Sequence, residues 1–110
     1  MAASAAVPRS TIIPKRRFGG DELAILLPET NSAEAAKLAE RIREVIAALP
    51  FVLTAQIERT LTVSVGVAAA AIGRHETDLK AVSDRLLADA DAALYRAKAL
   101  GRNRVQVGAG

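Results

Sequence analysis

The sequence contains no cysteine and only one histidine, His75, among its 110 residues. The absence of cysteine excludes disulfide bonds, thiolate metal sites and a cysteine nucleophile, and it favours the reducing cytoplasm as the location of the chain. Because the single histidine lies in a polar stretch, a zinc site or a histidine-based catalytic mechanism has almost no support. The candidate functional groups are therefore carboxylates and basic side chains.

Aromatic residues are also scarce, at 3% of the chain, whereas 51% of the residues are hydrophobic and many of these are alanine. We therefore expect an aliphatic core of small side chains in one domain, the number that this length accommodates. No basic segment followed by a long apolar run occurs near the N-terminus, so we predict neither a signal peptide nor a membrane segment in this chain.

The formal net charge is +3 and the pI is about 9.8, which favours anionic partners such as nucleotides or nucleic acids. The basic run at residues 15–17 is followed by one aromatic residue, Phe18, and no platform for stacking bases is visible. A charged edge strand that resists aggregation explains this run better. We therefore predict no nucleic-acid partner; a nucleic-acid binder would show tight and steeply salt-dependent affinity.

The first third of the chain predicts a β-hairpin. Residues 1–10 are rich in Ala, Ser and Pro, and we expect them to be poorly ordered. Residues 11–18 are typical of an edge strand. The apolar run at 23–27 predicts a buried strand that ends at Pro28. The two strands would be joined by the turn at residues 19–22.

The rest of the chain predicts two helices and two further strands. Asn31, with Glu34 three residues later, matches a variant of the capping box and precedes a helical pattern that Pro50 ends. A second helical pattern covers residues 79–100, and Gly101 follows it where a C-terminal cap is expected.

Residues 60–68 alternate between aliphatic side chains and small or polar ones, which indicates a strand with two different faces. A loop at 69–78 and a final strand at 104–107 complete the pattern. The predicted order is β-β-α-β-α-β, which indicates an α/β or α+β sandwich-like fold, a sheet with flanking helices.

Two clusters of residues are candidates for a functional site. Gly19 and Gly20 remove side chains at a turn, so a ligand can approach the main chain, and Asp21 and Glu22 then offer two carboxylates. Such a pair, together with substrate phosphates, is a common ligand set for Mg²⁺. A glycine-rich hairpin turn with two solvated acids is the alternative interpretation.

The second cluster lies at the end of the second helix. Lys98 and Arg102 are four residues apart, a spacing that places both side chains on one helical face, where they could clamp a polyphosphate. The alternative interpretation is that two cations are placed near a helix C-terminus because the helix dipole favours them there.

Three blocks of the sequence together resemble GGDEF domains, the diguanylate cyclases. RFGGDELAILLPET resembles the signature hairpin of that family, and TVSVGVA and LLADADAALYRAKALGRNRV resemble its later strand and its C-terminal helix and strand. The resemblance spans about residues 17–107 with the blocks in the right order. Leu23 replaces the usual aromatic residue, at a position that we expect to be buried.

The resemblance implies a function. The family condenses two GTP molecules into cyclic di-GMP, a bacterial second messenger, with release of pyrophosphate, and two domains face each other so that each 3′-hydroxyl attacks the other α-phosphate. The metal would be Mg²⁺ (or Mn²⁺). The site residues implied by the resemblance are Asp21 and Glu22 (catalysis and metal), Gly19 and Gly20 (nucleotide), and Lys98 and Arg102 (terminal phosphates).

The resemblance also begins near the middle of the family's domain. No Asp, Glu or Asn occurs in residues 1–20, so the family's earlier metal ligand and guanine-reading residues have no counterpart there, and its Arg-x-x-Asp inhibition motif is absent. We therefore expect residues 11–110 to be a partial GGDEF domain, truncated at its N-terminus, with weak or no cyclase activity as an isolated chain.

Loss of a central strand would expose apolar surface, which favours self-association or a homodimer. A longer parent protein would carry a sensory or receiver domain. The alternative function is a non-catalytic GGDEF-like interaction or dimerisation module, but such a module has no need for Asp21 and Glu22, and both are present.

Overall fold

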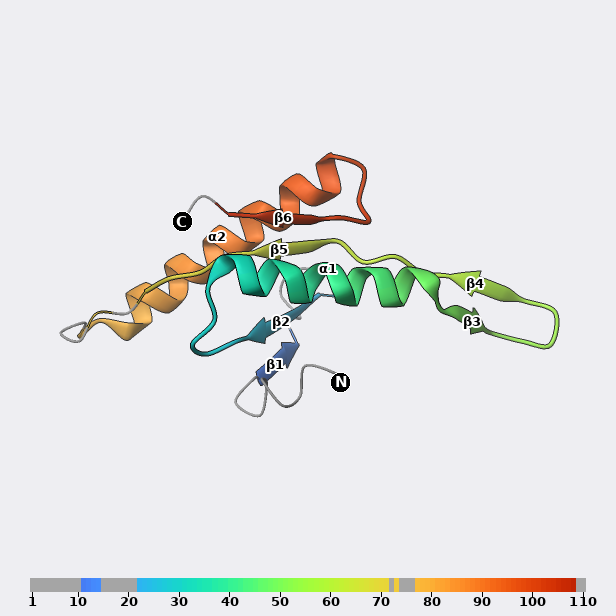
Figure 1. Cartoon of the computed structure of the whole chain (residues 1–110), viewed down its shortest axis with the longest axis horizontal. Helices are drawn as coiled ribbons and strands as arrows, with labels where there is room; N and C mark the ends of the chain where they lie inside the picture. Colours follow the sequence, from blue (N-terminus) through green and yellow to red (C-terminus); the bar gives the residue numbers. More distant parts are fainter. Residues whose placement is uncertain (1–10, 15–21, 72, 74–76, 109–110) are drawn as a thin grey trace. The chain divides into compact units, whose positions relative to one another are not determined.

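The structure, a computed structural model, describes residues 11–14, 22–71, 73 and 77–108. The chain divides into two compact units, Met1–Thr30 and Asn31–Gly110, which are described separately below. Figure 1 shows the order of the elements along the chain.

The first unit contains the predicted pair of strands. β1 (Thr11–Pro14) and β2 (Leu23–Leu26) are antiparallel, with Thr11 opposite Leu26 and Pro14 opposite Leu23. The expectation of a buried strand with a buried Leu23 is wrong, because Leu23 is 65% exposed and Ile25 and Leu26 are exposed as well. In the described residues β2 has one strand neighbour, so an apolar sequence alone does not bury it. The predicted disorder of residues 1–10 lies outside the described residues.

The second unit begins with the predicted helix. α1 (Ser32–Ala48) follows Asn31, whose Oδ1 accepts a hydrogen bond from the Glu34 backbone N–H at 2.8 Å. The Glu34 carboxylate accepts one in return from the Asn31 backbone N–H at 3.5 Å. This reciprocal pair satisfies two N–H groups of the first turn that have no partner within the helix. The predicted capping box is confirmed.

A strand–helix–strand unit follows later in the chain. β5 (Val65–Val67) and β6 (Val105–Val107) are parallel, with Val65 opposite Val105 and Val67 opposite Val107, and α2 (Leu79–Ala99) connects them. Parallel neighbours need a crossover of this kind, because a tight turn can join only antiparallel strands. Both α1 and α2 contact this strand pair.

Close packing between α2 and β5 depends on Gly66. A Cβ at this position would lie 2.9 Å from the Cα of Leu94 and well inside the van der Waals distance of the Ala90 carbonyl oxygen. The helix presents small side chains, and Ala93 and Ala97 are completely buried. The core of aliphatic and small residues is thus confirmed; among the described residues its buried apolar members are Ala39, Val67, Val82, Ala93 and Ala97.

The predicted order of elements lacks two strands. β3 (Pro50–Val52) and β4 (Glu58–Thr60) form an antiparallel hairpin, with Pro50 opposite Thr60. The single strand predicted at 60–68 is therefore divided, because its first residue pairs with β3 while Val65 pairs with β6. Alternating side chains indicate an extended backbone, but they do not identify its hydrogen-bonding partner.

The fold class predicted from the sequence, a mixed α/β architecture, is confirmed, and the strands form three two-stranded sheets in the described residues. In the part of the chain that the structure describes, neither helix combines the length and the hydropathy needed to cross a bilayer.

Candidate functional site

The C-terminal end of α2 is closed by two backbone hydrogen bonds. The Gly101 N–H donates to the Lys98 carbonyl oxygen at 3.3 Å, and the Arg102 N–H donates to the Ala97 carbonyl oxygen at 2.9 Å. Gly101 has a φ of 119°, which a residue with a Cβ rarely adopts. These bonds make a Schellman motif and confirm Gly101 as the cap.

The cap changes the geometry predicted for the two cations. Lys98 lies in the last turn of α2 and is half-buried, whereas Arg102 lies beyond the end of the helix at Ala99, with an exposed side chain. The argument that both share one helical face is therefore wrong, because the Schellman turn redirects the chain before Arg102. The bond from the Arg102 N–H to Ala97 nevertheless holds its backbone against the turn that carries Lys98.

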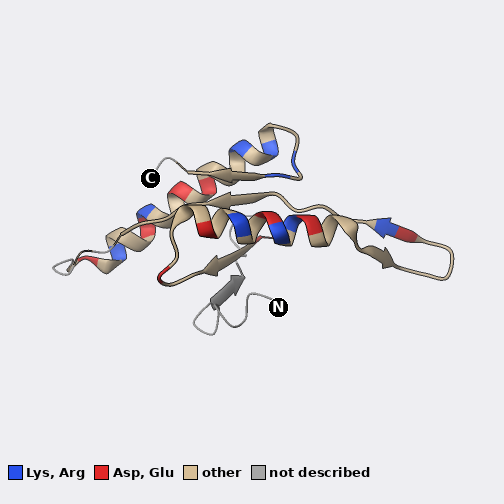
Figure 2. Cartoon of the chain, viewed as in Figure 1, with Lys and Arg blue, Asp and Glu red and all other residues tan. Residues whose placement is uncertain are grey.

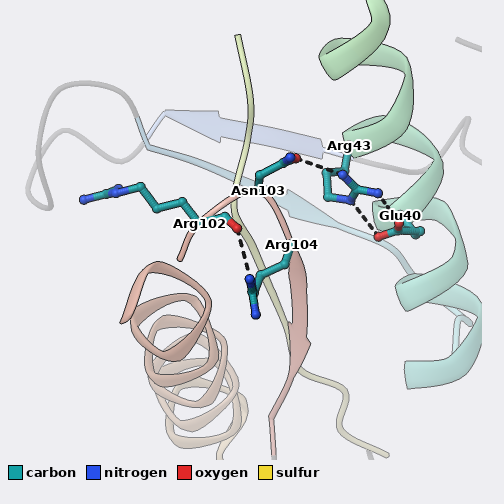
Figure 3. A network of polar contacts seen from close by, with 5 residues as sticks. All are labelled: Glu40, Arg43, Arg102, Asn103 and Arg104. Atoms are coloured by element: carbon teal, nitrogen blue, oxygen red, sulfur yellow. Dashed lines mark hydrogen bonds and ion pairs between the residues drawn. The ribbon is translucent and has the colours of Figure 1, made fainter. Parts of the chain in front are cut away.

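We call residues 101–104 the GRNR turn. It is bound to elements far away in the sequence: the Asn103 N–H donates to the Ser64 Oγ at 3.2 Å, and the Arg104 carbonyl oxygen accepts from the Val65 N–H at 2.9 Å. The Asn103 Oδ1 accepts from Nη1 of Arg43, on α1, at 2.8 Å (Figure 3).

Arg43 is itself held by Glu40, one turn earlier on α1. Its Nε donates to the Glu40 Oε2 at 2.9 Å, and its Nη2 donates to the other carboxylate oxygen. Hydrogen bonding to Arg43 lowers the pKa of Glu40, and the same contact raises the pKa of Arg43. Sequence spacing could have suggested this pair, but it contains no signal for Asn103, which is 60 residues away from Arg43.

The end of α2 and the GRNR turn carry a concentration of positive charge. Figure 2 shows basic residues in both segments. The sequence from 92 to 110 contains no Asp or Glu, while Arg96, Lys98, Arg102 and Arg104 all lie in it. The Arg102 guanidinium points away from the contacts that hold the turn (Figure 3), and its side chain is exposed. An anion is the ligand that this arrangement favours.

The acidic turn, the name used below for the turn predicted at residues 19–22, belongs to the first unit. Gly19, Gly20 and Asp21 lie outside the described residues, and Glu22 is half-buried immediately before β2. No three potential metal-ligating side chains come together within the described ranges. The chemistry of the predicted donors still fits Mg²⁺ or Mn²⁺, because both ions prefer carboxylate oxygen. The structure thus joins the backbone of Arg102 to the helical turn that carries Lys98, and it describes Glu22 alone of the four residues predicted for the acidic turn.

The chain is similar to known proteins over most of its length. The family model described as diguanylate cyclase, GGDEF domain, matches residues 9–104. The response regulator PleD of Caulobacter vibrioides is 40% identical over 90 residues, which are 81% of this chain and 18% of that protein. The diguanylate cyclase DgcP of Pseudomonas aeruginosa is 42% identical over 91 residues, which are 83% of this chain and 12% of that protein.

A solved structure shows the same fold. The GGDEF domain of DgcB from Caulobacter crescentus, in complex with c-di-GMP, superposes with a TM-score of 0.75 and 27% identity over 99% of this chain and 57% of that one. The chain thus spans little more than half of that solved chain and less than a fifth of PleD. Because the family model covers nearly the whole sequence, the chain belongs to the GGDEF family of diguanylate cyclase domains.

Proposed function

We propose that this chain takes part in the condensation of two GTP molecules into cyclic di-GMP, with release of pyrophosphate, in bacterial second-messenger signalling in the cytoplasm. The observation that carries the proposal is the GRNR turn. In a chain of this family, the turn presents the exposed Arg102 side chain beside the helical turn that bears Lys98.

Lys98 and Arg102 bind the terminal phosphates of GTP in this proposal. A guanidinium and an ammonium suit this role because both donate charge-assisted hydrogen bonds to phosphate oxygens. Phosphoryl transfer depends mainly on positioning and on neutralising charge, so cations held in place contribute directly to catalysis.

In this proposal the acidic turn binds the metal ion and activates the attacking hydroxyl. Gly19 and Gly20 line the nucleotide, and Asp21 and Glu22 hold Mg²⁺ (or Mn²⁺), which when bound neutralises charge on the phosphates. Asp21, assisted by Glu22, accepts the proton of the 3′-hydroxyl as that oxygen bonds to the α-phosphorus of the other GTP. The bond between the α-phosphorus and the bridging oxygen then breaks, and pyrophosphate leaves.

Two copies are needed because each GTP attacks the other, so we propose a homodimer or a larger self-associated form. The exposed apolar side chains of Leu23, Ile25 and Leu26 support this, since apolar surface left in contact with water favours association. We also propose a sensory or receiver domain in a longer parent protein. The isolated chain would be weakly active or inactive, because its sequence offers no counterpart of the family's guanine-reading residues.

A non-catalytic interaction or dimerisation module is the second candidate. The same exposed residues of β2 favour it, because they provide a contact surface without requiring a nucleotide. The two candidates differ in GTP binding, which the cyclase needs and the module does not.

The test is to titrate the chain with GTP and Mg²⁺ by calorimetry and to resolve the products by chromatography. Arg102→Ala should weaken GTP binding about tenfold or more, the value of a lost charge-assisted hydrogen bond. Arg85→Ala, which removes an equal and exposed charge elsewhere on α2, is the matched control and should bind like the parent.

Cyclic di-GMP from the parent but not from Asp21→Asn/Glu22→Gln would establish the cyclase, and a rate that rises with the square of chain concentration would show that two copies react. GTP binding that Arg102→Ala does not weaken contradicts the proposed phosphate site. Absence of any GTP binding by the parent leaves the interaction module.

A further inference from the structure

Two consecutive residues of the GRNR turn have a backbone conformation that needs support. The φ angles of Arg102 and Asn103 are 63° and 47°, in the left-handed region. Asparagine tolerates this region, but arginine does not favour it. Such a conformation persists only where surrounding contacts determine it.

The contacts that determine it come from three directions. The Schellman bond to Ala97 holds the Arg102 N–H, and the Ser64 Oγ holds the Asn103 N–H. The Asn103 side chain is held from α1 by Arg43, as Figure 3 shows. Within the turn, Arg104 Nε donates to the Arg102 carbonyl oxygen at 3.1 Å. Arg43 therefore connects α1 to the GRNR turn through its hydrogen bond to Asn103.

The guanidinium of Arg43 is pre-oriented for this contact. Glu40 engages Nε and Nη2, which leaves Nη1 to donate to Asn103. The side chain of Arg43 is only 19% exposed, so it lies against the protein rather than in free solvent. Because the guanidinium is planar and two of its nitrogens are bound to Glu40, it has little freedom to rotate. Nη1, its remaining donor, is therefore held in a fixed position.

We propose that Arg43 and Glu40 are positioning residues for phosphate binding: through Asn103 they hold the GRNR turn so that Arg102 is presented to the terminal phosphates of GTP. The proposal rests on the proposed function, because it takes Arg102 as a phosphate ligand. Neither Arg43 nor Glu40 touches the nucleotide. Their effect on affinity passes through Arg102.

The experiment measures two quantities on the full chain, GTP affinity by calorimetry and the protection of the Arg102 and Asn103 amides by hydrogen exchange without nucleotide. Arg43→Ala should speed exchange of these amides about tenfold and raise the Kd for GTP about fivefold, because the turn is then free to leave its bound geometry. Asn103→Gly should give a similar loss of affinity, although glycine accepts the positive φ, because it lacks the oxygen that Arg43 binds.

A double-mutant cycle separates positioning from general stability. In the Arg102→Ala background, Arg43→Ala should cause no further loss of GTP affinity, since its effect passes through Arg102. Arg85→Ala, an exposed charge on α2, is the control for loss of positive charge. Urea midpoints of all variants show whether the fold is retained.

Equal losses in both backgrounds, or unchanged amide exchange and affinity in Arg43→Ala, would overturn the positioning role while GTP binding by the parent keeps the proposed function. A parent chain that does not bind GTP overturns both. A parent that binds GTP, with the loss in Arg43→Ala confined to the background that keeps Arg102, supports both.

Discussion

Two regions of this chain have similar apolar content, but the apolar side chains of one are buried and those of the other are exposed. In the β5–α2–β6 unit, Val67 is 7% exposed and the alanines of α2 are buried, whereas in the β3–β4 hairpin Val52 is 71% exposed and Leu53 is 65% exposed. The difference lies in the opposing surface. Gly66 and the small side chains of α2 allow backbone to approach backbone, but the hairpin has no comparable cover in the described residues. Burial follows from a complementary face, not from hydrophobicity alone.

The largest expected effect on stability comes from a substitution that prevents the close packing of β5 against α2. Gly66→Ala forces a methyl group into the backbone of α2 at Ala90 and Leu94. We expect a loss of about 3 kcal/mol in the free energy of unfolding, the upper range for overpacking. Gly73→Ala is the matched control, because a Cβ there meets nothing within 4 Å. Urea denaturation measures both, and equal midpoints would contradict the packing described for α2.

A smaller effect is expected from truncating one valine in each region. Val67→Ala should lower the free energy of unfolding by about 2 kcal/mol, because two buried methyl groups are lost and a cavity remains. Val52→Ala should change it by less than about 0.5 kcal/mol, as is usual for exposed positions. The same chemical change is made twice, so similar losses would mean that the hairpin is covered in solution. Self-association of the chain would be one such cover, and light scattering on the same samples would detect it.

The smallest effect concerns the ion pair beside the GRNR turn. Because Arg43 lowers the pKa of Glu40 below its ordinary value of 4.5, the pair stabilises the fold above about pH 4.5. That stabilisation is lost as the pH falls through the lowered pKa. The melting temperature of Glu40→Gln should therefore fall less than that of the parent as the pH is lowered. Glu58→Gln, at an exposed carboxylate of the hairpin, controls for the loss of one negative charge. Thermal unfolding between pH 3 and pH 7 is the measurement, and an equal fall in melting temperature for the parent and Glu40→Gln would contradict the pair's role.

Several features of the fold were predictable because they depend on neighbours in sequence. The capping box at Asn31 and Glu34 and the Schellman turn at Gly101 satisfy groups only a few residues away, so a short segment contains the whole interaction. The family could be recognised because three ordered blocks retain their spacing. The β3–β4 hairpin was missed, since Pro50 reads as a helix stop and not as the first residue of a strand.

The candidate site was predictable only in part. Charge and spacing identify Lys98 and Arg102 as candidates, but placing both on one helical face assumes a helix that continues through Gly101, where the predicted cap already ends it. The hydrogen bond between Arg43 and Asn103 could not be predicted from the sequence. Arg43 is explained locally by an ion pair within α1, and Asn103 is explained locally as a turn residue.

The sequence by itself therefore determined where the helices begin and end, which residues are small enough to pack closely, and the family to which the chain belongs. These depend on backbone periodicity and on hydrogen bonds that close within one turn. Only the tertiary structure decided that residues 60–68 divide between two partners, that Leu23 is exposed, and that α1 holds the turn carrying Arg102. Each of these depends on which distant segment lies alongside, and no local pattern specifies that choice.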